Sequence, residues 1–332
     1  DVLRLEHIDI PEPGDGELRV KVLGIPFNLN DLERVTGGNM MVRPEFPYSP
    51  GMEVMGRVEK CGKGCESWQG KHVVAMPAGA HGGYAEYAIC PPVSAFEVPK
   101  EIPLPDAAAL YFPYHLAWLG LIERAKVQEG ETVLIHAAAG SVGSAAIQLA
   151  VNAGARVIAT AGADEKLDWC RKLGADIAVN YNRDDFVAVV KEATGKKGVD
   201  VVFDTVGEAV MEQSLGAIAY NGRYIMMGFS SDKTVADEKF LVPRRLALSN
   251  ISLCTVMLAY ADEAMSDFLK DGMGWNFVPA ALGEKINSII VSLVQNGEIK
   301  PAIGRVVGFE DIPRTLQDLA DRKTVGKVIA IP

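Results

Sequence analysis

A short run of small residues, Ala138-Ala139-Gly140-Ser141-Val142-Gly143, has the composition of a phosphate-binding turn in this 332-residue chain. It matches the dinucleotide fingerprint G-x-G-x-x-G, with Ala138 at the first glycine position. Gly140 would let the backbone approach a pyrophosphate, and Gly143 would let helix and strand pack closely. The N–H groups at the helix start would bind the phosphate oxygens. A tight strand-to-helix turn needs small residues in any case, so the motif is informative only between a strand and a helix.

The neighbouring residues supply that context. Residues 132–136, TVLIH, have the β-branched and aliphatic pattern of a buried parallel strand. The stretch SAAIQLAVNAG suits a packed helix that ends at Gly154. We therefore predict that this turn binds a dinucleotide through Ala139, Gly140, Ser141, Val142 and Gly143.

The end of the next strand indicates which dinucleotide is bound. An NAD site normally places Asp or Glu there, about 20 residues after the fingerprint, to accept hydrogen bonds from the ribose hydroxyls. Here ARVIAT leads into Ala161-Gly162-Ala163 without an acid, and Lys166 follows. Taken alone, Lys166 would be interpreted as a solvated helix lysine. The missing carboxylate and the nearby cation together favour a 2′-phosphate, so we predict NADPH, contacted by Gly162 and Lys166.

Alternating elements must position these residues. From ARVIAT to GRYIMMGFS, strand and helix patterns alternate, which predicts an α/β fold with a doubly wound parallel sheet. The chain before the fingerprint differs: short strands separated by Pro and Gly turns begin at the first residues, and a helix is predicted over 105–125. After it we expect a strand over 250–258, helices over 285–297 and 312–322, and a final strand from Lys327.

The composition excludes several classes of function. Hydrophobic residues make up 48% of the chain and charged residues 23%, as in a globular protein. A net charge of −10 at pH 7 provides no basic surface for nucleic acid or an anionic membrane. No apolar run reaches the length of a membrane span. Five scattered cysteines, an odd number, favour a reduced and cytoplasmic compartment over a disulfide framework.

Segments spread over essentially the whole chain carry a family resemblance. They are PEPGDGELRVKV, FNLND, PGMEVMG, GGYAEY, HAAAGSVGSAAIQLA, ATAGADEKL, VNY, GVDVVFD and GKVIAIP. Together they resemble the zinc-free, zeta-crystallin-like NADPH:quinone oxidoreductases of the medium-chain dehydrogenase/reductase superfamily. The resemblance implies a GroES-like β-barrel catalytic domain (1–110 and 255–332), an inserted Rossmann domain (111–254), and a cofactor cleft between them. It also implies that the chain begins in the second strand of the barrel, so that an N-terminal piece would be missing.

The resemblance provides a test for metal. Zinc-dependent relatives hold catalytic zinc with an early Cys and the His of a G-H-E triplet, and four clustered cysteines hold a structural zinc. Here Asn28 stands at the Cys position, and Gly51-Met52-Glu53 replaces the triplet. Cys61 and Cys65 have no second pair nearby, and two thiolates are too few for tetrahedral zinc. We therefore predict that no metal is bound.

The chemistry that remains is direct hydride transfer from nicotinamide to a quinone or to an alkene conjugated to a carbonyl. The protein must orient the ring, exclude water and stabilise the oxyanion that forms. Asn28 and Asp31 match the N-x-x-D pair that lies by the nicotinamide in the family, and they are the predicted catalytic residues. Helix capping is the alternative interpretation of both, because Asn and Asp are favoured caps.

The resemblance also places the substrate pocket. Met40 stands where relatives often have a tyrosine facing the substrate, and Leu116 stands where many have a threonine near the nicotinamide. Both changes remove a hydroxyl and make the pocket more apolar. Tyr48 and Met52 complete the predicted pocket. His115 is a possible proton donor without a partner in the sequence, and a structural role is favoured for it.

Further cofactor contacts are implied by position in the family motifs. Tyr181 of VNY would lie against the region of the 2′-phosphate, and Arg322 would reach back to the cofactor. The residues implied to line the nicotinamide ribose are Thr205, Val206, Gly228, Phe229 and Ser230. Packing is the alternative role for the two aromatic residues. His136, at the end of the fingerprint strand, is interpreted as structural.

Two other functions stay open beside quinone reduction. The first is an enoyl-thioester or 2-alkenal reductase on the same scaffold, for which Arg244 and Arg245 are the candidate contacts to a CoA phosphate. The second is a protein that binds NADPH without turnover, against which the intact Gly140, Gly143 and Asn28 argue. We also predict a homodimer, since the apolar strand 250–258 would be an exposed sheet edge in a monomer, and family members pair through it.

Overall fold

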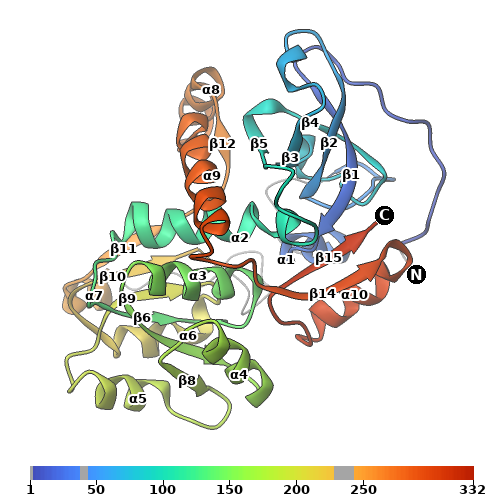
Figure 1. Cartoon of the computed structure of the whole chain (residues 1–332). Coiled ribbons are helices and arrows are strands. Elements are labelled where there is room, and N and C mark those ends of the chain that lie inside the picture. The colour runs from blue at the N-terminus through green and yellow to red at the C-terminus, as the bar shows by residue number, and fades with distance from the viewer. Residues whose placement is uncertain (1–2, 38–43, 228–242) are drawn as a thin grey trace. The chain divides into compact units, whose positions relative to one another are not determined.

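Two large β-sheets organise the chain in a computed structural model, which describes residues 3–37, 44–227 and 243–332. The chain divides into two units (Figure 1). Unit 1 comprises residues 1–115 and 258–332, and unit 2 comprises residues 116–257. The predicted α/β class is confirmed, because helices and strands alternate through unit 2 while unit 1 is built mainly on strands.

Unit 1 is built around strand β1 (Leu18–Pro26), which pairs antiparallel with three strands. The sheet has the order β14-β15-β1-β2-β3-β5, and β4 also pairs with β1. Its other members are β2 (Val54–Cys61), β3 (His72–Ala75), β4 (Tyr87–Cys90), β5 (Ala95–Glu97), β14 (Ile303–Gly308) and β15 (Lys327–Ile331). In Figure 1 these strands are blue to cyan and red, so both halves of the sequence build this sheet. The pairing of β15 with β1 carries Lys327 to the barrel strands that begin the chain.

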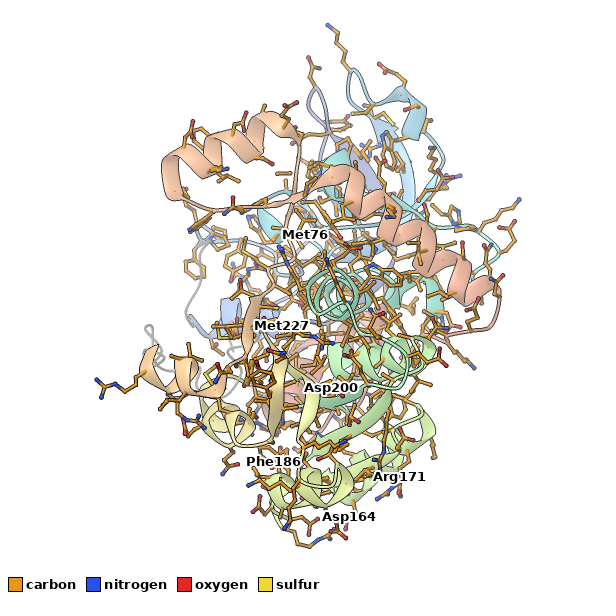
Figure 2. The ribbon with its side chains drawn as sticks, turned by 90° about the vertical axis from the view of Figure 1, so that its left-hand side faces the viewer. Met76, Asp164, Arg171, Phe186, Asp200 and Met227 are labelled. Carbon is orange, nitrogen blue, oxygen red and sulfur yellow. The ribbon has the colours of Figure 1, made fainter. Side chains whose placement is uncertain are left out.

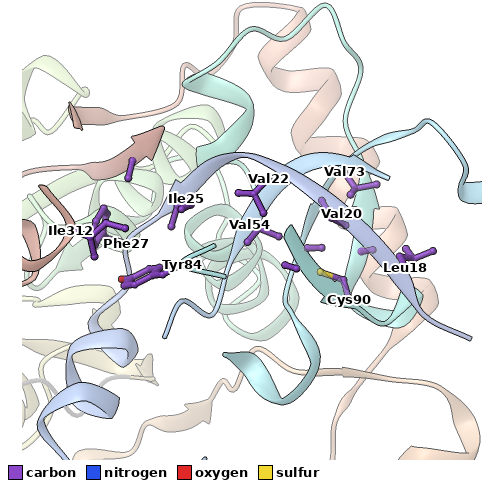
Figure 3. Packing of buried hydrophobic residues seen from close by; sticks show 14 of the residues in the cluster. Leu18, Val20, Val22, Ile25, Phe27, Val54, Val73, Tyr84, Cys90 and Ile312 are labelled. Carbon is purple, nitrogen blue, oxygen red and sulfur yellow. The ribbon is translucent and has the colours of Figure 1, made fainter. Parts of the chain in front are cut away.

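Alternating apolar residues form the core of unit 1. Leu18, Val20 and Val22 lie on one face of β1 and are buried, as Figure 3 shows. They pack with Val54 of β2 and Cys90 of β4. Because burying one such aliphatic side chain is worth about 1.5–3 kcal/mol, this face holds the strands together.

The helices of unit 1 connect and cover these strands. They are α1 (Leu29–Thr36), α2 (Phe112–Trp118, continuing into unit 2), α8 (Glu263–Met273), α9 (Ala280–Gln295) and α10 (Ile312–Ala320). Short 3₁₀ turns lie at η1 (Glu66–Trp68), η2 (Ala78–Ala80), η3 (Pro92–Ser94), η4 (Asp106–Ala109) and η6 (Phe309–Asp311). A two-stranded parallel ribbon, β12 (Tyr260–Ala261) with β13 (Val278–Pro279), packs against α8 and α9.

Unit 2 is a six-stranded parallel sheet of order β11-β10-β9-β6-β7-β8. Its strands are β6 (Thr132–Ile135), β7 (Arg156–Ala161), β8 (Ile177–Asn180), β9 (Val199–Asp204), β10 (Ile218–Met226) and β11 (Ser252–Thr255). The intervening helices are α3 (Ser141–Asn152), α4 (Asp164–Lys172), α5 (Phe186–Ala193), α6 (Glu208–Leu215) and α7 (Pro243–Ser249), and a π-helical segment, η5 (Leu119–Arg124), precedes the sheet. The chain builds β6 to β8 outward and then crosses to β9 on the other side of β6. Open α/β sheets bind their ligands at the carboxyl ends of the strands beside such a reversal.

Three predicted elements differ in the structure. Residues 3–17 form no strand. The neighbouring strand β1 already pairs with β2, β4 and β15, and Pro11 and Pro13 have no N–H group to donate. The helix predicted over 105–125 is divided into η4, α2 and η5, because Pro113 cannot continue a helix and is accepted only in a first turn. The strand predicted over 250–258 shortens to β11. In addition, α8 and β14 were not predicted. No helix in the described ranges is long and apolar enough to span a bilayer.

Candidate active site and cofactor site

The fingerprint forms the turn between β6 and α3 in unit 2. Gly140 is the residue before the helix and has an extended backbone, without a side chain to cap the first N–H groups of α3. These donors are the ones that bind anions at helix starts. Ser141, the first residue of α3, has a buried Oγ without a hydrogen-bond partner among the described residues. The helix start therefore offers unsatisfied donors where the fingerprint would hold a pyrophosphate.

The close approach expected at Gly143 is present. A Cβ on Gly143 would lie 2.5 Å from the carbonyl oxygen of Ala137 and 2.6 Å from the Cα of Ala138. Both are backbone atoms, so no side chain could turn aside to make room. A Cβ on Gly140 would meet only the Ala137 oxygen, at 3.2 Å. The residues present therefore fit a bound pyrophosphate, with Gly143 as the position that admits no side chain.

The ends of β7 and β8 bring together Gly162 and Tyr181. A Cβ on Gly162 would lie 2.5 Å from the Tyr181 hydroxyl oxygen, so the tyrosine covers this glycine. Tyr181 remains 44% exposed. Asn182 donates from Nδ2 to the Gly162 carbonyl oxygen at 2.9 Å. Lys166 follows in the first turn of α4, where it is half-buried.

A second cation at this edge was not predicted. Arg183 contacts Asp164, with 3.4 Å between Nη1 and Oδ1, and also contacts Asp184. Asp164 begins α4 and is labelled in Figure 2 with Arg171 of the same helix. Its carboxylate also accepts from Asn180 Nδ2 at 3.2 Å, so the acid nearest in sequence to the end of β7 already has partners. The position of Arg183 two residues after Tyr181 could have identified it.

Asp204 fixes the turn after β9, which contains the predicted Thr205 and Val206. Its Oδ1 accepts from the N–H groups of Val206 at 2.7 Å and Gly207 at 3.1 Å. Its Oδ2 accepts from the Tyr224 hydroxyl at 2.6 Å. Burial raises the pKa of Asp204 above its usual range. Asp204 thus holds the turn in shape, a role that the sequence did not reveal.

His136 links three elements of unit 2 from a fully buried position. Its Nδ1 lies 3.0 Å from Thr160 Oγ1 of β7, and its Nε2 lies 2.8 Å from Ser214 Oγ of α6. Ser214 donates its own proton to the Val210 carbonyl, so Nε2 must carry the imidazole proton and Nδ1 must accept from Thr160. Burial lowers the pKa of His136 to about 3, which keeps the ring neutral.

In unit 1 the structure brings Asn28, Asp31 and Met52 together, all three buried. Asn28 is the residue before α1 and forms a capping box with Asp31, which confirms the capping interpretation of this pair. The Asp31 carboxylate accepts from the Asn28 N–H at 3.0 Å and from the Met52 N–H at 2.8 Å. Burial raises the pKa of Asp31 to about 6, against the opposing effect of these hydrogen bonds and of the Arg34 charge. Asp31 thereby ties the start of α1 to the segment before β2.

A buried ion pair adjoins Asn28. The Lys327 Nζ lies 2.7 Å from Asn28 Oδ1 and 2.8 Å from Glu53 Oε2. The same Glu53 oxygen accepts from Asn28 Nδ2 at 2.9 Å, and Glu53 Oε1 accepts from the Phe112 N–H at 3.0 Å. Glu53 was expected only as part of the altered metal triplet, and no role was predicted for Lys327. Burial of a lysine is rare enough that no sequence pattern would have predicted it.

The remaining predicted residues are more scattered. Tyr48 donates from its hydroxyl to the Arg34 carbonyl at 3.0 Å, and burial raises its pKa. Leu116 is buried in α2. Arg322 is exposed in the turn after α10, with a left-handed φ of 56°. The predicted residues that lie outside the described ranges are Met40, Gly228, Phe229 and Ser230.

His115 has a partner that the sequence did not reveal. Its Nδ1 lies 2.8 Å from the Tyr260 hydroxyl, within a cluster of rings that includes Phe96 and Tyr111. Burial lowers the pKa of His115 to about 3, so the ring is neutral at physiological pH. The enclosed position and the aromatic surroundings favour a structural role.

Comparison with known proteins places this geometry in a family. Residues 14–100 match the alcohol dehydrogenase GroES-like domain, and residues 141–271 match the family described as zinc-binding dehydrogenases. Quinone oxidoreductase-like protein 2 of Bos taurus is 34% identical over 316 residues, which cover 94% of this chain and 84% of that protein. The chain belongs to the quinone oxidoreductase-like family of the medium-chain dehydrogenase/reductase superfamily. A homologue from Nematostella vectensis is 31% identical over 95% of this chain and 82% of its own length.

Solved structures agree with this family assignment. A mycobacterial protein in complex with NADPH has a TM-score of 0.84 and 29% identity, covering 99% of this chain and 95% of that one. A quinone oxidoreductase of Pseudomonas syringae has a TM-score of 0.82 and 25% identity, covering 98% and 94%. The predicted family is therefore confirmed, and so is the fold, a GroES-like domain combined with a Rossmann-like parallel sheet. Within the residues that the structure describes, no three His, Cys, Asp or Glu side chains are grouped to hold a metal.

Proposed function

We propose that this family member is an NADPH-dependent reductase that passes a hydride to quinones or related conjugated carbonyl compounds without a metal. The start of α3 carries the cofactor part of the proposal. There the buried Ser141 Oγ and the uncapped first turn provide unsatisfied donors, and Gly143 allows the close approach that a pyrophosphate site requires. The family and its quinone-reducing members support the acceptor class.

The charge at the ends of β7 and β8 supports NADPH over NADH. Lys166 supplies a cation in the first turn of α4, and Tyr181 supplies a hydroxyl beside Gly162, whereas Arg183 is paired with Asp164 and Asp184. A 2′-phosphate needs such donors, whereas a ribose hydroxyl needs a carboxylate acceptor. Asp164 is the acid nearest in sequence to the end of β7, and it is already bound to Arg183 and Asn180.

Replacing Lys166 tests this choice of cofactor. Lys166→Ala is expected to weaken NADPH binding about tenfold and to leave NADH binding nearly unchanged, since charge-assisted bonds to phosphate are worth about 1.5–3 kcal/mol at most. The measurement is fluorescence titration with each nucleotide. Lys172→Ala, an exposed lysine at the other end of α4, is the matched control. An equal loss for NADH and NADPH would contradict the phosphate assignment.

The proposed catalytic end lies in unit 1, around Asn28 and Asp31. Bound NADPH supplies the hydride, and the chain must position the acceptor and exclude water. Met52 provides an apolar side chain. The Asp31 carboxylate accepts from the N–H groups of both Asn28 and Met52, which holds these two residues side by side. Tyr48 donates to a backbone carbonyl, and both Asp31 oxygens accept. These engaged groups favour an acceptor such as a quinone, which after hydride transfer needs one proton that water can supply.

The unit 1 site also supports metal-free chemistry. The resemblance placed Asn28 and Met52 where zinc-dependent relatives have Cys and His, and neither an amide nor a thioether is a usual zinc ligand. The Lys327 ammonium occupies one oxygen of Glu53 at 2.8 Å. A dication beside that ammonium would be repelled, so the charge arrangement disfavours a metal.

One assay decides between the proposed function and its two alternatives. NADPH consumption is followed with a para-quinone, an ortho-quinone, a 2-alkenal and a crotonyl thioester, and NADH serves as the paired control. Turnover of quinones alone would support the proposal, and preference for the alkenal or thioester would make the protein an alkene reductase. Tight NADPH binding without any turnover would indicate a non-catalytic binding protein.

Arg245, one candidate contact to CoA, already pairs with Glu212 at 2.7 Å.

We further propose a homodimer that pairs through β11, and a cytoplasmic location, which the five free cysteines favour. β11 is the edge of the unit 2 sheet, and its Leu253 is 37% exposed. Leu253→Lys is expected to convert the dimer into a 35.7-kDa monomer in light scattering, because charge on an edge strand prevents pairing. Val151→Lys, at 40% exposure on α3, should leave the dimer intact. A monomeric wild-type protein would contradict the dimer.

A further inference from the structure

The ion pair beside Asn28 joins residues that are far apart in the sequence. Glu53 lies directly before β2, and Lys327 is the first residue of β15. Both side chains are only 1% exposed. The pairing of β15 with β1 brings Lys327 back to the start of the barrel, where Asn28 follows β1 by two residues. The two charges therefore meet at Asn28 although 274 residues separate them.

These two charges determine which way the Asn28 amide faces. An ammonium only donates hydrogen bonds, so the atom of Asn28 that lies 2.7 Å from Lys327 Nζ must be the carbonyl oxygen Oδ1. An ionised carboxylate only accepts, so the atom 2.9 Å from Glu53 Oε2 must be Nδ2. The opposite orientation would place the amide NH₂ against the ammonium and the amide oxygen against the carboxylate. The charges of Glu53 and Lys327 therefore select one of the two possible orientations of the Asn28 amide.

The selected orientation also determines which hydrogen bonds Asn28 can still make. Nδ2 donates to Glu53 and, at 3.4 Å, to the Pro26 carbonyl, so both of its protons are engaged. Oδ1 has two lone pairs, of which Lys327 occupies one, and the capping box of α1 brings the Asp31 N–H, which bonds the Asn28 backbone oxygen, near this side chain. Asn28 therefore has little donor capacity left, and Oδ1 is its one side-chain atom that can accept a further bond. This is the reverse of what an amide would need to stabilise an oxyanion by donating to it.

A buried ion pair is poorly explained by stability alone. Removing both charges from water costs several kcal/mol, and replacing such a pair with apolar residues of similar size is often neutral. An apolar pair, in contrast, could not fix the orientation of the neighbouring Asn28 amide. Fixing the geometry of a group beside the reacting atoms has large effects on rate.

We infer that Glu53 and Lys327 are positioning residues that hold Asn28 as a hydrogen-bond acceptor at the proposed active site. Its ligand there would be a donor group, a hydroxyl of the reduced acceptor. The inference rests on the proposed function, because it assigns Asn28 to the catalytic end. Glu53 and Lys327 act through Asn28 and touch no substrate themselves.

The test is a double-mutant cycle between the ion pair and Asn28. Lys327→Met alone would leave a buried carboxylate unpaired and could prevent folding, so the pair is replaced together as Glu53→Leu/Lys327→Met. In the wild-type background this replacement is expected to lower kcat for quinone reduction about tenfold or more, with little change in NADPH affinity. In an Asn28→Ala background, the same replacement should change kcat by less than about twofold, the limit within which independent sites add.

A matched pair and a second readout separate positioning from general damage. Arg223→Met/Glu131→Leu removes a partly buried ion pair from unit 2 and should change kcat by less than about twofold. Side-chain amide exchange of Asn28, followed by NMR, should be slow in wild type and fast in the Glu53→Leu/Lys327→Met variant. An equal fold-loss of kcat in both Asn28 backgrounds would overturn the inference, and so would unchanged amide exchange. If the wild type reduces no acceptor, the proposed function fails and the exchange measurement alone decides whether the pair orients Asn28.

Discussion

Gly143→Ala is expected to weaken NADPH binding by about one to two orders of magnitude, which corresponds to the 1–3 kcal/mol that an overpacked methyl group costs. The added Cβ would lie 2.5 Å and 2.6 Å from backbone atoms of the turn, at Ala137 and Ala138. Since neither atom belongs to a movable side chain, the start of α3 would have to withdraw from the turn. That displacement would carry Ser141 and the uncapped N–H groups away from the phosphates.

Fluorescence titration with NADPH measures the effect, and a helical glycine elsewhere controls for the substitution itself. Gly272 in α8 has no atom within 4 Å of an added Cβ, so Gly272→Ala should bind NADPH as the wild type does. It should also be slightly more stable, since Ala is favoured over Gly inside a helix by up to about 1 kcal/mol. NADPH affinity that survives Gly143→Ala would contradict the proposed pyrophosphate site.

Features that depend on neighbouring residues could be predicted from the sequence. The fingerprint lies in a single strand, turn and helix, so the pattern of about twenty residues determined both the elements and the close approach at Gly143. The parallel sheet of unit 2 followed from the same local alternation. Quinone oxidoreductase-like membership came from motifs that also occupy short segments.

Features that depend on long-range pairing could not be predicted. Nothing in GKVIAIP distinguishes Lys327 from an exposed lysine, and its burial arises only when β15 joins β1. The Asp204 carboxylate accepts from the Tyr224 hydroxyl of the next strand, a contact that forms only when β9 and β10 pair. α8 was missed as well, although Met265, Phe268 and Leu269 recur at helical spacing, and none of its residues is buried.

The second large effect expected is a loss of stability in acid that depends on His136. Burial lowers its pKa from 6.5 to about 3 in the folded protein. Below pH 6.5 the unfolded chain takes up a proton that the folded protein refuses, so acid favours unfolding. The free energy of unfolding should therefore fall by about 1.4 kcal/mol per pH unit from this residue, until the pH approaches 3. Two units of acidification would remove about 3 kcal/mol, a large part of an ordinary stability.

Urea unfolding between neutral pH and about pH 4 measures this slope in wild type and in two variants. His136→Gln removes the titrating ring, so its stability should decline less steeply in acid than that of the wild type. Asp31→Asn should do the opposite. Burial raises the Asp31 pKa from 3.8 to about 6, so the folded protein gains that proton first and is stabilised as the pH falls through this range.

The opposite signs make the prediction demanding. Loss of a general structural contact would lower stability by the same amount at every pH and would leave all three slopes parallel. A flatter slope for His136→Gln and a steeper slope for Asp31→Asn require that the pKa values of the two buried groups are displaced in opposite directions. Parallel slopes would therefore show that His136 and Asp31 titrate alike in the folded and unfolded chain. In that case the enclosure that keeps His136 neutral and raises the pKa of Asp31 to about 6 would not exist in solution.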